Sequence, residues 1–185
     1  MTGNDAAKMA GIFAVGLIGG RLLAPLIASA SGNVRTRMGA DPFDRLVEDH
    51  REILSVLHEM ENAGTESSRG HKGKLLLRVK RMLGKHAMAE EDVVYPLLHD
   101  RAHAESETKQ LYDEHADIKI HLYELEQMVM NNEDWRHRVM SLRRLIETHA
   151  RQEEEQEFPR LRRILQDREQ AMLAGQIRRE EALVL

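Results

Sequence analysis

The sequence has 185 residues, enough for one domain with a core and an additional segment. It contains no cysteine, which excludes disulfides, thiolate zinc sites, iron–sulfur clusters and thiol nucleophiles. Acidic and basic residues are mixed and the formal net charge is -4, so we expect no nucleic-acid partner. Charged residues make up 31% and aromatic residues 4%, and no alternating apolar runs predict strands, so an all-α protein is expected.

Residues 1–40 differ in composition from the rest of the chain. Residues 9–27 are apolar apart from Arg21, and a membrane-spanning helix needs about 20 such residues. Three interpretations stay open: a membrane anchor or membrane-surface helix, a signal cleaved near the A-x-A at 28–30, or a helix that packs on the bundle or on another subunit. If the segment spans, Arg35 and Arg37 place the following domain in the cytoplasm. The predicted location is therefore cytoplasmic, with membrane association under the first interpretation.

The remainder of the chain predicts four long helices joined by short connections. Their expected ranges are Pro42–Asn62, His71–Asp100, Glu105–Val129 and a last helix from about Asp134 toward Ile164. Short connections favour antiparallel neighbours, so we predict an antiparallel up-down-up-down four-helix bundle over residues 41–165. An extra apolar helix would precede it within residues 1–40, and a helical extension would follow it over residues 166–185.

The predicted bundle contains an internal repeat. Residues 86–96 and 149–159, which lie 63 positions apart, both read H-A-x-x-E-E-[DE]-x-x-[YF]-P. The two preceding helices share L-x-x-x-H-x-x-I-x-x-x-L around His50 and His115, which lie 65 positions apart. Each half is thus predicted to be a helical hairpin that carries one histidine on its first helix and H-x-x-x-E on its second.

The spacing of the repeated residues points to a metal site. Positions i and i+4 share a helix face, and all the repeated histidines and glutamates fall in the apolar rows of their helices. A buried carboxylate without a partner costs several kcal/mol, so a shared cation is the expected neutraliser. The candidate metal ligands are His50, His86, Glu90, His115, His149 and Glu153. If both glutamates bridge, each of two ions receives two imidazoles and two carboxylate oxygens, with room for an oxo or hydroxo bridge and an exogenous ligand; iron, manganese and zinc all suit such donors.

Two other side chains are considered near the site. His58 lies two turns from His50 on the same face, and Tyr123 occupies the equivalent place after His115. Either can approach the site or simply pack, and we expect packing. The remaining histidines are expected at the surface.

The second helix of each hairpin carries two further signals. The acidic run 153–157 is expected to be a solvated face with one inward member, and the repeat favours Glu153 over Glu154 for that place. Pro96 and Pro159 follow the two H-x-x-x-E motifs and are expected to kink or shift their helices near the site.

With its two H-x-x-x-E motifs, each preceded by a single histidine, the segment Asp41–Leu165 resembles the hemerythrin-like HHE cation-binding family. The resemblance implies a four-helix bundle that holds two iron ions on the six residues named above. Oxygen-carrying hemerythrins have a second histidine where this chain has Lys119, and their last carboxylate lies five residues beyond its histidine, whereas Glu153 lies four beyond His149. The loss of one imidazole argues against reversible oxygen carriage, and Lys119 is expected to leave a coordination position open.

Three functions follow from this interpretation. The first is a protein that binds or senses oxygen, peroxide or nitric oxide, or senses iron, with that small molecule as its partner. The second is a peroxide-consuming, catalase- or peroxidase-like enzyme in which Tyr123 or His58 assists proton transfer. The third is a structural metal or iron-storage role. A homo-oligomer is compatible with all three.

Overall fold

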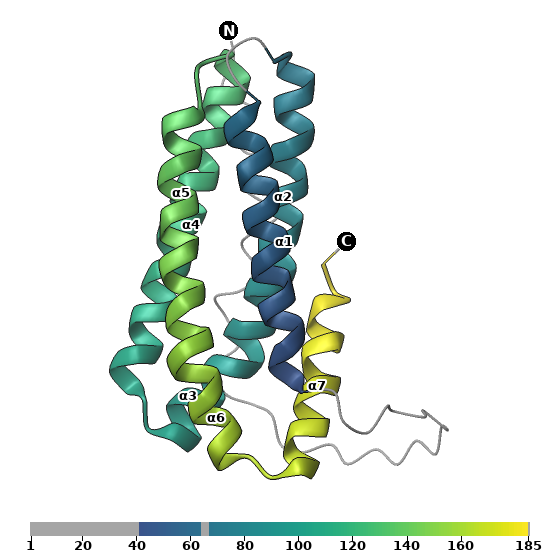
Figure 1. Cartoon of the computed structure of the whole chain (residues 1–185), viewed down its shortest axis with the longest axis vertical. Coiled ribbons are helices and arrows are strands. Elements are labelled where there is room, and N and C mark those ends of the chain that lie inside the picture. Colours follow the sequence, from purple (N-terminus) through teal and green to yellow (C-terminus); the bar gives the residue numbers. More distant parts are fainter. Residues whose placement is uncertain (1–40, 64–66, 185) are drawn as a thin grey trace, which may run out of the picture. The chain divides into compact units, whose positions relative to one another are not determined.

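The computed structural model of the chain describes residues 41–63 and 67–184. These residues form an all-helical bundle, and they contain no strand (Figure 1). The all-α prediction is therefore confirmed. The apolar helix predicted within residues 1–40 lies outside the described residues, so its three interpretations stay predictions. None of the described helices is long and apolar enough to cross a bilayer.

The helices follow one another with very little irregular chain between them. Their bounds are α1 Pro42–Asn62, α2 Arg69–Ala89, the π-helical turn η3 Glu90–Val94, α3 Tyr95–Ala102, α4 Glu105–Asn131, α5 Arg136–Gln152, the π-helical turn η4 Glu153–Glu157, α6 Phe158–Ile164 and α7 Asp167–Glu181. The segments α2, η3 and α3 form one continuous long helix, and so do α5, η4 and α6. The bundle therefore consists of four long helices and α7.

Side chains at the predicted breaks fix where the helices begin and end. Asp41 accepts a hydrogen bond from the Phe43 backbone N–H (2.8 Å) at the start of α1, and Ser68 Oγ accepts one from the backbone N–H of the third residue of α2 (3.2 Å). Asp134 accepts one from the Arg136 N–H (3.1 Å) before α5. Asn132 ends α4 in a left-handed conformation with φ of 56°. The local sequence thus sets the helix boundaries.

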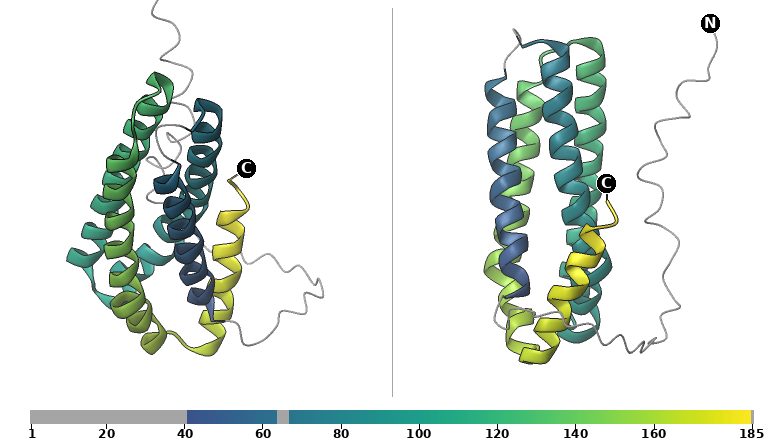
Figure 2. Two further views of the ribbon diagram at one scale, coloured as in Figure 1. Left: turned by 45° about the horizontal axis from the view of Figure 1, so that its top comes forward. Right: turned by 90° about the vertical axis from the view of Figure 1, so that its right-hand side faces the viewer.

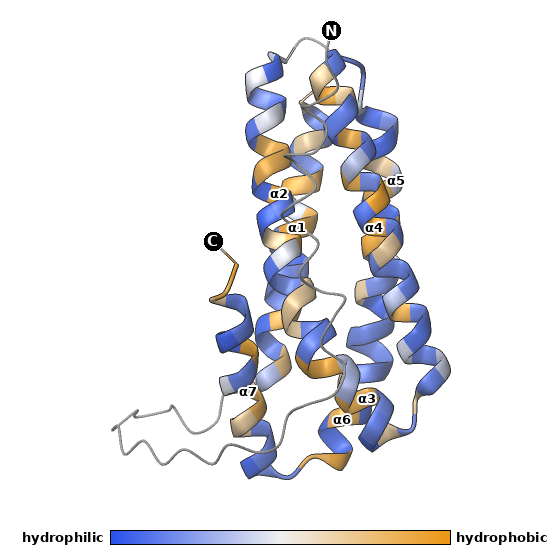
Figure 3. Ribbon diagram, turned by 180° about the vertical axis from the view of Figure 1, so that it is seen from behind, coloured by the Kyte–Doolittle hydropathy of each residue, from blue (hydrophilic) through white to orange (hydrophobic). Residues whose placement is uncertain are grey.

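The four long helices pack as a ring. α1 contacts both α2 and α5, and α4 contacts the same two helices. The two views of Figure 2 show these helices side by side along the bundle. Hydrophilic residues cover much of their outer faces (Figure 3).

The buried apolar residues form two clusters at the two ends of the ring. The upper cluster surrounds Trp135, whose Nε1 donates to the Ala63 carbonyl (3.0 Å). The lower cluster surrounds Phe43 and Phe158, whose rings stack with centroids 4.9 Å apart. On each long helix, a short stretch of residues separates those that belong to the upper cluster from those that belong to the lower cluster. The predicted histidine of each helix lies in that stretch.

Helix α7 is the predicted C-terminal extension. It packs against α1 and α2, and its Leu173 and Ile177 join the lower cluster. Glu181 near its end pairs with Arg45 of α1 (2.6 Å). The extension therefore closes one side of the bundle at its lower end (Figure 1).

Both prolines of the repeat follow a π-helical turn. Tyr95 N–H bonds the carbonyl of Glu90, five residues earlier, and the same bond recurs in the second half. Proline lacks an N–H, and its ring crowds the preceding turn, so a wider turn accommodates Pro96 and Pro159. The predicted shift of both helices thus takes the form of one π turn in each, and each turn begins at a candidate glutamate ligand.

Candidate metal centre

The structure brings the six predicted ligands together in one layer between the two apolar clusters. His50 lies on α1, His86 on α2, His115 on α4 and His149 on α5. The two glutamates are the first residues of η3 and η4. Each of the six is at most 3% exposed. The layer is therefore a buried polar centre inside an apolar bundle.

Glu90 lies between histidines of both halves. Its Oε1 is 3.0 Å from His86 Nε2 and 3.9 Å from His50 Nε2. Its Oε2 is 3.4 Å from His115 Nε2. One carboxylate oxygen therefore faces the histidines of the first hairpin and the other faces the second, which is the placement that a bridging carboxylate needs.

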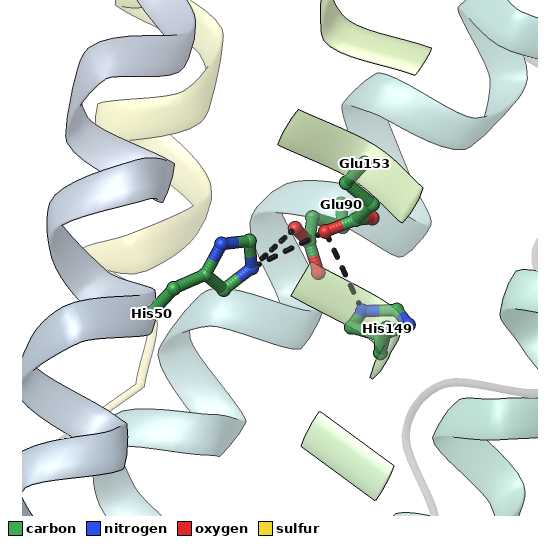
Figure 4. A group of neighbouring side chains, drawn as sticks. All are labelled: His50, Glu90, His149 and Glu153. Atoms are coloured by element: carbon green, nitrogen blue, oxygen red, sulfur yellow. Dashed lines mark ion pairs between the residues drawn. The ribbon is translucent and has the colours of Figure 1, made fainter. Parts of the chain in front are cut away.

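Glu153 also lies between histidines of both halves, but it contacts them through a single oxygen. Its Oε2 lies 3.2 Å from His50 Nε2 and 3.5 Å from His149 Nε2. Figure 4 shows these two histidines and both carboxylates converging on a common space. The ligand atoms of His50, Glu90, His149 and Glu153 all lie within 4.8 Å of one another, so this group can hold a metal ion.

The inner polar atoms fit a cation because the protein does not satisfy them. Among the described residues, the Nε2 atoms of His50 and His86, both oxygens of Glu90 and Oε2 of Glu153 are buried and have no hydrogen-bond partner. Several of them lie at ion-pair distance from one another, as His86 Nε2 does from Glu90 Oε1 at 3.0 Å. Unpaired buried carboxylates are costly, and a metal ion held by nitrogen and oxygen would supply the missing partner.

The outer nitrogens of the histidines face a second set of carboxylates. Nδ1 lies 2.9 Å from Glu154 in His50, 2.8 Å from Glu91 in His115 and 2.8 Å from Glu114 in His149. In His86 it lies 3.8 Å from Asp49, which is beyond hydrogen-bond length, so Asp49 acts on this ring by charge. Because an ionised carboxylate only accepts, the three bonded Nδ1 atoms carry a proton, so Nε2 is the atom of each neutral ring that is left to bind a cation.

The outer carboxylates obey the same repeat as the inner ligands. Glu91 and Glu154 are 63 residues apart, and Asp49 and Glu114 are 65 residues apart. The first pair reaches across to a histidine of the other half, whereas the second pair faces the histidine that follows on the same hairpin. Glu91, Glu114 and Glu154 therefore hold their histidines in place, and Glu91 and Glu154 also tie the two hairpins together.

Several predictions about the surroundings need correction. The acidic run was expected to have one inward member, but Glu157 is fully buried as well as Glu153, because the π turn changes which residues of the run face inward. Glu154 is not a competing ligand but the partner of His50. His58 and Tyr123 face solvent, with side-chain exposure of 70% and residue exposure of 62% respectively, so neither approaches the centre.

Lys119 was expected to leave a metal coordination position open, and the positions of Lys119 and Tyr95 bear on that expectation. Lys119 Nζ points outward and donates to Glu91 Oε1 (2.9 Å), the same oxygen that accepts from His115. The Tyr95 hydroxyl instead reaches the inner side, 2.9 Å from His115 Nε2 and 3.0 Å from Glu153 Oε1. The inner position of Tyr95 was not predicted from the sequence. The one signal for it was the difference between the two halves of the repeat, which have tyrosine and phenylalanine at this position.

Without a metal, protons on the imidazoles balance the carboxylates. Burial alone would lower the pKa of His86, but the charges of Glu90 and Asp49 raise it to about 10. Burial would also lower the pKa of His115, but Glu90 and Glu91 raise it to about 9. Burial would raise the pKa of Glu90, yet its histidine neighbours hold it well below the usual value. Metal binding must therefore displace protons from this layer.

Comparison with known proteins agrees with this geometry. The family model described as "Hemerythrin HHE cation binding domain" matches residues 41–161. A protein of Nostoc sp. named "DNA nickase" is 27% identical over 144 residues, which cover 74% of this chain and 40% of that protein. This chain therefore corresponds to less than half of that relative's length. No solved structure matches the chain.

The metal-free protein should lose stability as the pH rises from about 6.5 toward 10. The raised pKa values of His86 and His115 mean that their protonated forms stabilise the fold fully below 6.5, and this contribution is lost as pH passes through about 9 and 10. Urea unfolding of chelator-treated protein at the two ends of this range measures the loss. A metal-free His86→Gln variant should show a smaller drop, and equal stability of the wild type at both ends would contradict the assignment.

Loss of an outer carboxylate should weaken metal binding without removing a ligand. Glu114→Ala deprives His149 of its Nδ1 partner, so we expect metal affinity to fall by about 10–100-fold. Competition with a chelator measures the affinity. Asp113→Ala removes the same charge from the exposed neighbour on α4 and should leave affinity unchanged; an equal loss in both variants would indicate a general charge effect instead.

Proposed function

Because the chain belongs to the hemerythrin HHE cation-binding domain family, we propose that it is a non-haem di-iron protein that binds or senses a small molecule such as oxygen, peroxide or nitric oxide, or senses iron. The observation that carries the proposal is the position of both glutamates between two pairs of inward-facing histidines. The proposed iron ligands are His50, His86, Glu90, His115, His149 and Glu153. Manganese or zinc would suit the same donors.

The repeat divides the ligands into two sets. His50 and His86 form one pair, with ring centroids 4.5 Å apart, and His115 and His149 form the other, with centroids 4.9 Å apart. Each pair would hold one ion, and the two carboxylates would neutralise and join them. We also infer that the long helices run up, down, up and down, because only short connections join each long helix to the next.

The protein's own residues would control access and reactivity. Bound iron supplies an electron-transfer site and a position for a small ligand. Outer carboxylates hold the imidazoles of His50, His115 and His149 in the ligating tautomer, and the apolar clusters on both sides keep bulk water out. The exposure of at most 3% at every ligand favours a small partner over a large substrate.

The peroxide-consuming enzyme remains the alternative within the same chemistry, and a structural or storage metal is the third. The enzyme was expected to use Tyr123 or His58 for proton transfer, and both of these face solvent. That arrangement supports binding or sensing over turnover. A storage or structural metal would stabilise the fold without reacting with small molecules.

Removal of a bridging carboxylate should reduce the iron content. After anaerobic iron loading, the wild type should carry about two irons per chain, and Glu153→Ala should carry one or fewer because both ions lose a shared ligand. Metal analysis by mass spectrometry measures the content. Glu155→Ala removes the same charge from an exposed neighbour and should retain the wild-type content; a wild type without iron would refute the proposal.

The same loaded samples separate the three functions. A spectral change that saturates with oxygen, peroxide or nitric oxide supports binding or sensing. Sustained evolution of oxygen from peroxide, lost in Glu153→Ala, supports the enzyme. Higher thermal stability with iron but no response to any of the three molecules supports the structural or storage role.

A second candidate function follows from one surface feature together with the name of the Nostoc relative. Helix α2 contains no acidic residue, although the whole chain has a formal net charge of -4. Its exposed basic residues are Arg69, Lys74, Arg78, Arg81 and Lys85. Of these, Arg78 pairs with Glu59 of α1 (3.2 Å). We propose, as this second candidate, that α2 contacts nucleic-acid phosphates and that the bound iron supports strand nicking. The sequence had predicted no nucleic-acid partner.

Incubation of supercoiled plasmid with the iron-loaded protein tests this second candidate. We expect conversion to the nicked circle, weakened by the charge reversals Lys74→Glu and Arg81→Glu and abolished with Glu153→Ala at the same total iron. The Lys109→Glu variant reverses an exposed charge on α4 as a control. If plasmid stays supercoiled, or if free iron nicks it equally, the second candidate is wrong.

A further inference from the structure

Tyr95 is a buried tyrosine at the centre of the ligand layer. The residue is 0% exposed, and its hydroxyl lies 2.9 Å from His115 Nε2 and 3.0 Å from Glu153 Oε1. Both neighbouring atoms are inner atoms of proposed ligands, on the side that faces the ions. The hydroxyl therefore shares the space that the ligand atoms enclose and does not stand behind them.

The π turn explains how Tyr95 reaches this position. Its N–H bonds the carbonyl of Glu90, so the two residues are separated by one wide turn and their side chains lie on the same side of the helix. The ring is held edge-on by Tyr112, with centroids 5.1 Å apart and planes at 81°, and it lies against the His115 ring at 5.3 Å. Packing thus fixes the hydroxyl inside the layer.

The distances match those between ligands of one ion. Donor atoms bound at about 2.0–2.2 Å and at right angles around one metal lie about 3 Å apart. The separation of Tyr95 Oη and His115 Nε2 is 2.9 Å, and that of His115 Nε2 and His149 Nε2 is 3.2 Å. Tyr95 stands where a further ligand of the ion held by His115 and His149 would stand.

We propose that Tyr95 is a phenolate ligand of the ion held by His115 and His149, an inference that rests on the proposed di-iron function. On coordination, the phenol O–H bond is replaced by an oxygen–metal bond, and the proton is released to solvent. Tyrosinate is a known protein ligand for iron.

The repeat makes this ligand unique to one half. Phe158 lies 63 residues after Tyr95, follows the second π turn in the same way and has no donor atom. Its ring stacks parallel to the His50 ring, with centroids 6.4 Å apart and planes at 5°. The two ions are therefore inequivalent, and the ion held by His50 and His86 is the one with a free position for a small molecule.

The absorption spectrum of the iron(III)-loaded chain tests the proposal directly. Coordinated tyrosinate gives a visible charge-transfer band and phenolate vibrations in resonance Raman spectra excited in that band. We expect both in the wild type and neither in Tyr95→Phe, while the iron content stays at about two per chain. The chain has three tyrosines, so Tyr112→Phe and Tyr123→Phe complete the set and should keep the band.

The outcomes distinguish this inference from the di-iron function. Two irons per chain without the band in the wild type, or with the band retained in Tyr95→Phe, would overturn the tyrosinate ligand and leave the di-iron function standing. A wild type that binds no iron would overturn both. If Tyr95→Phe fails to fold, as judged by circular dichroism, the Raman spectrum with ring-deuterated tyrosine is recorded for the wild type, Tyr112→Phe and Tyr123→Phe. Enhanced bands that shift with deuterium and persist in both variants assign the phenolate to Tyr95, and their absence overturns the proposal.

Discussion

Two carboxylates buried among four imidazoles are the constraint on which the rest of this structure depends. Glu90 and Glu153 are fully buried between two apolar clusters, where an unbalanced charge costs several kcal/mol. The elements around them are arranged so that these charges can be neutralised. One histidine from each long helix faces the carboxylates, and each π turn begins at one of them. The apolar clusters stabilise the bundle, and the polar layer between them requires either protons or metal ions.

The internal repeat extends beyond the ligands themselves. The outer carboxylates follow the same spacing, and Glu91 and Glu154 each orient a histidine of the other hairpin. This exchange means that neither hairpin contains a complete set of ligands and outer partners. The symmetry is broken where the repeat pairs Tyr95 with Phe158, so two ions in nearly equivalent cages would have different surroundings.

Much of the helical fold, and the burial of the four histidines and two glutamates in one layer, was predictable from the sequence for physical reasons. Helix ends are local events set by residues such as Asp41 and Asn132, and the inward direction of His86 follows from its place in an apolar row. The π turns were not predictable in form, because a pattern with a period of 3.6 residues assumes a regular helix. For that reason the burial of Glu157 and the inner position of Tyr95 were missed, since both lie after a wide turn that changes the direction of their side chains.

The cross-hairpin partners also determine how an ion can enter or leave. Apolar layers close the centre at both ends, and Lys119 and Glu91 close part of its side with an ion pair at the surface. Separation of the two hairpins, which breaks the contacts of Glu91 and Glu154 with their histidines, would open a path for an ion. On this path, the rate of metal exchange would depend on the opening of the bundle as well as on the strength of the metal–ligand bonds.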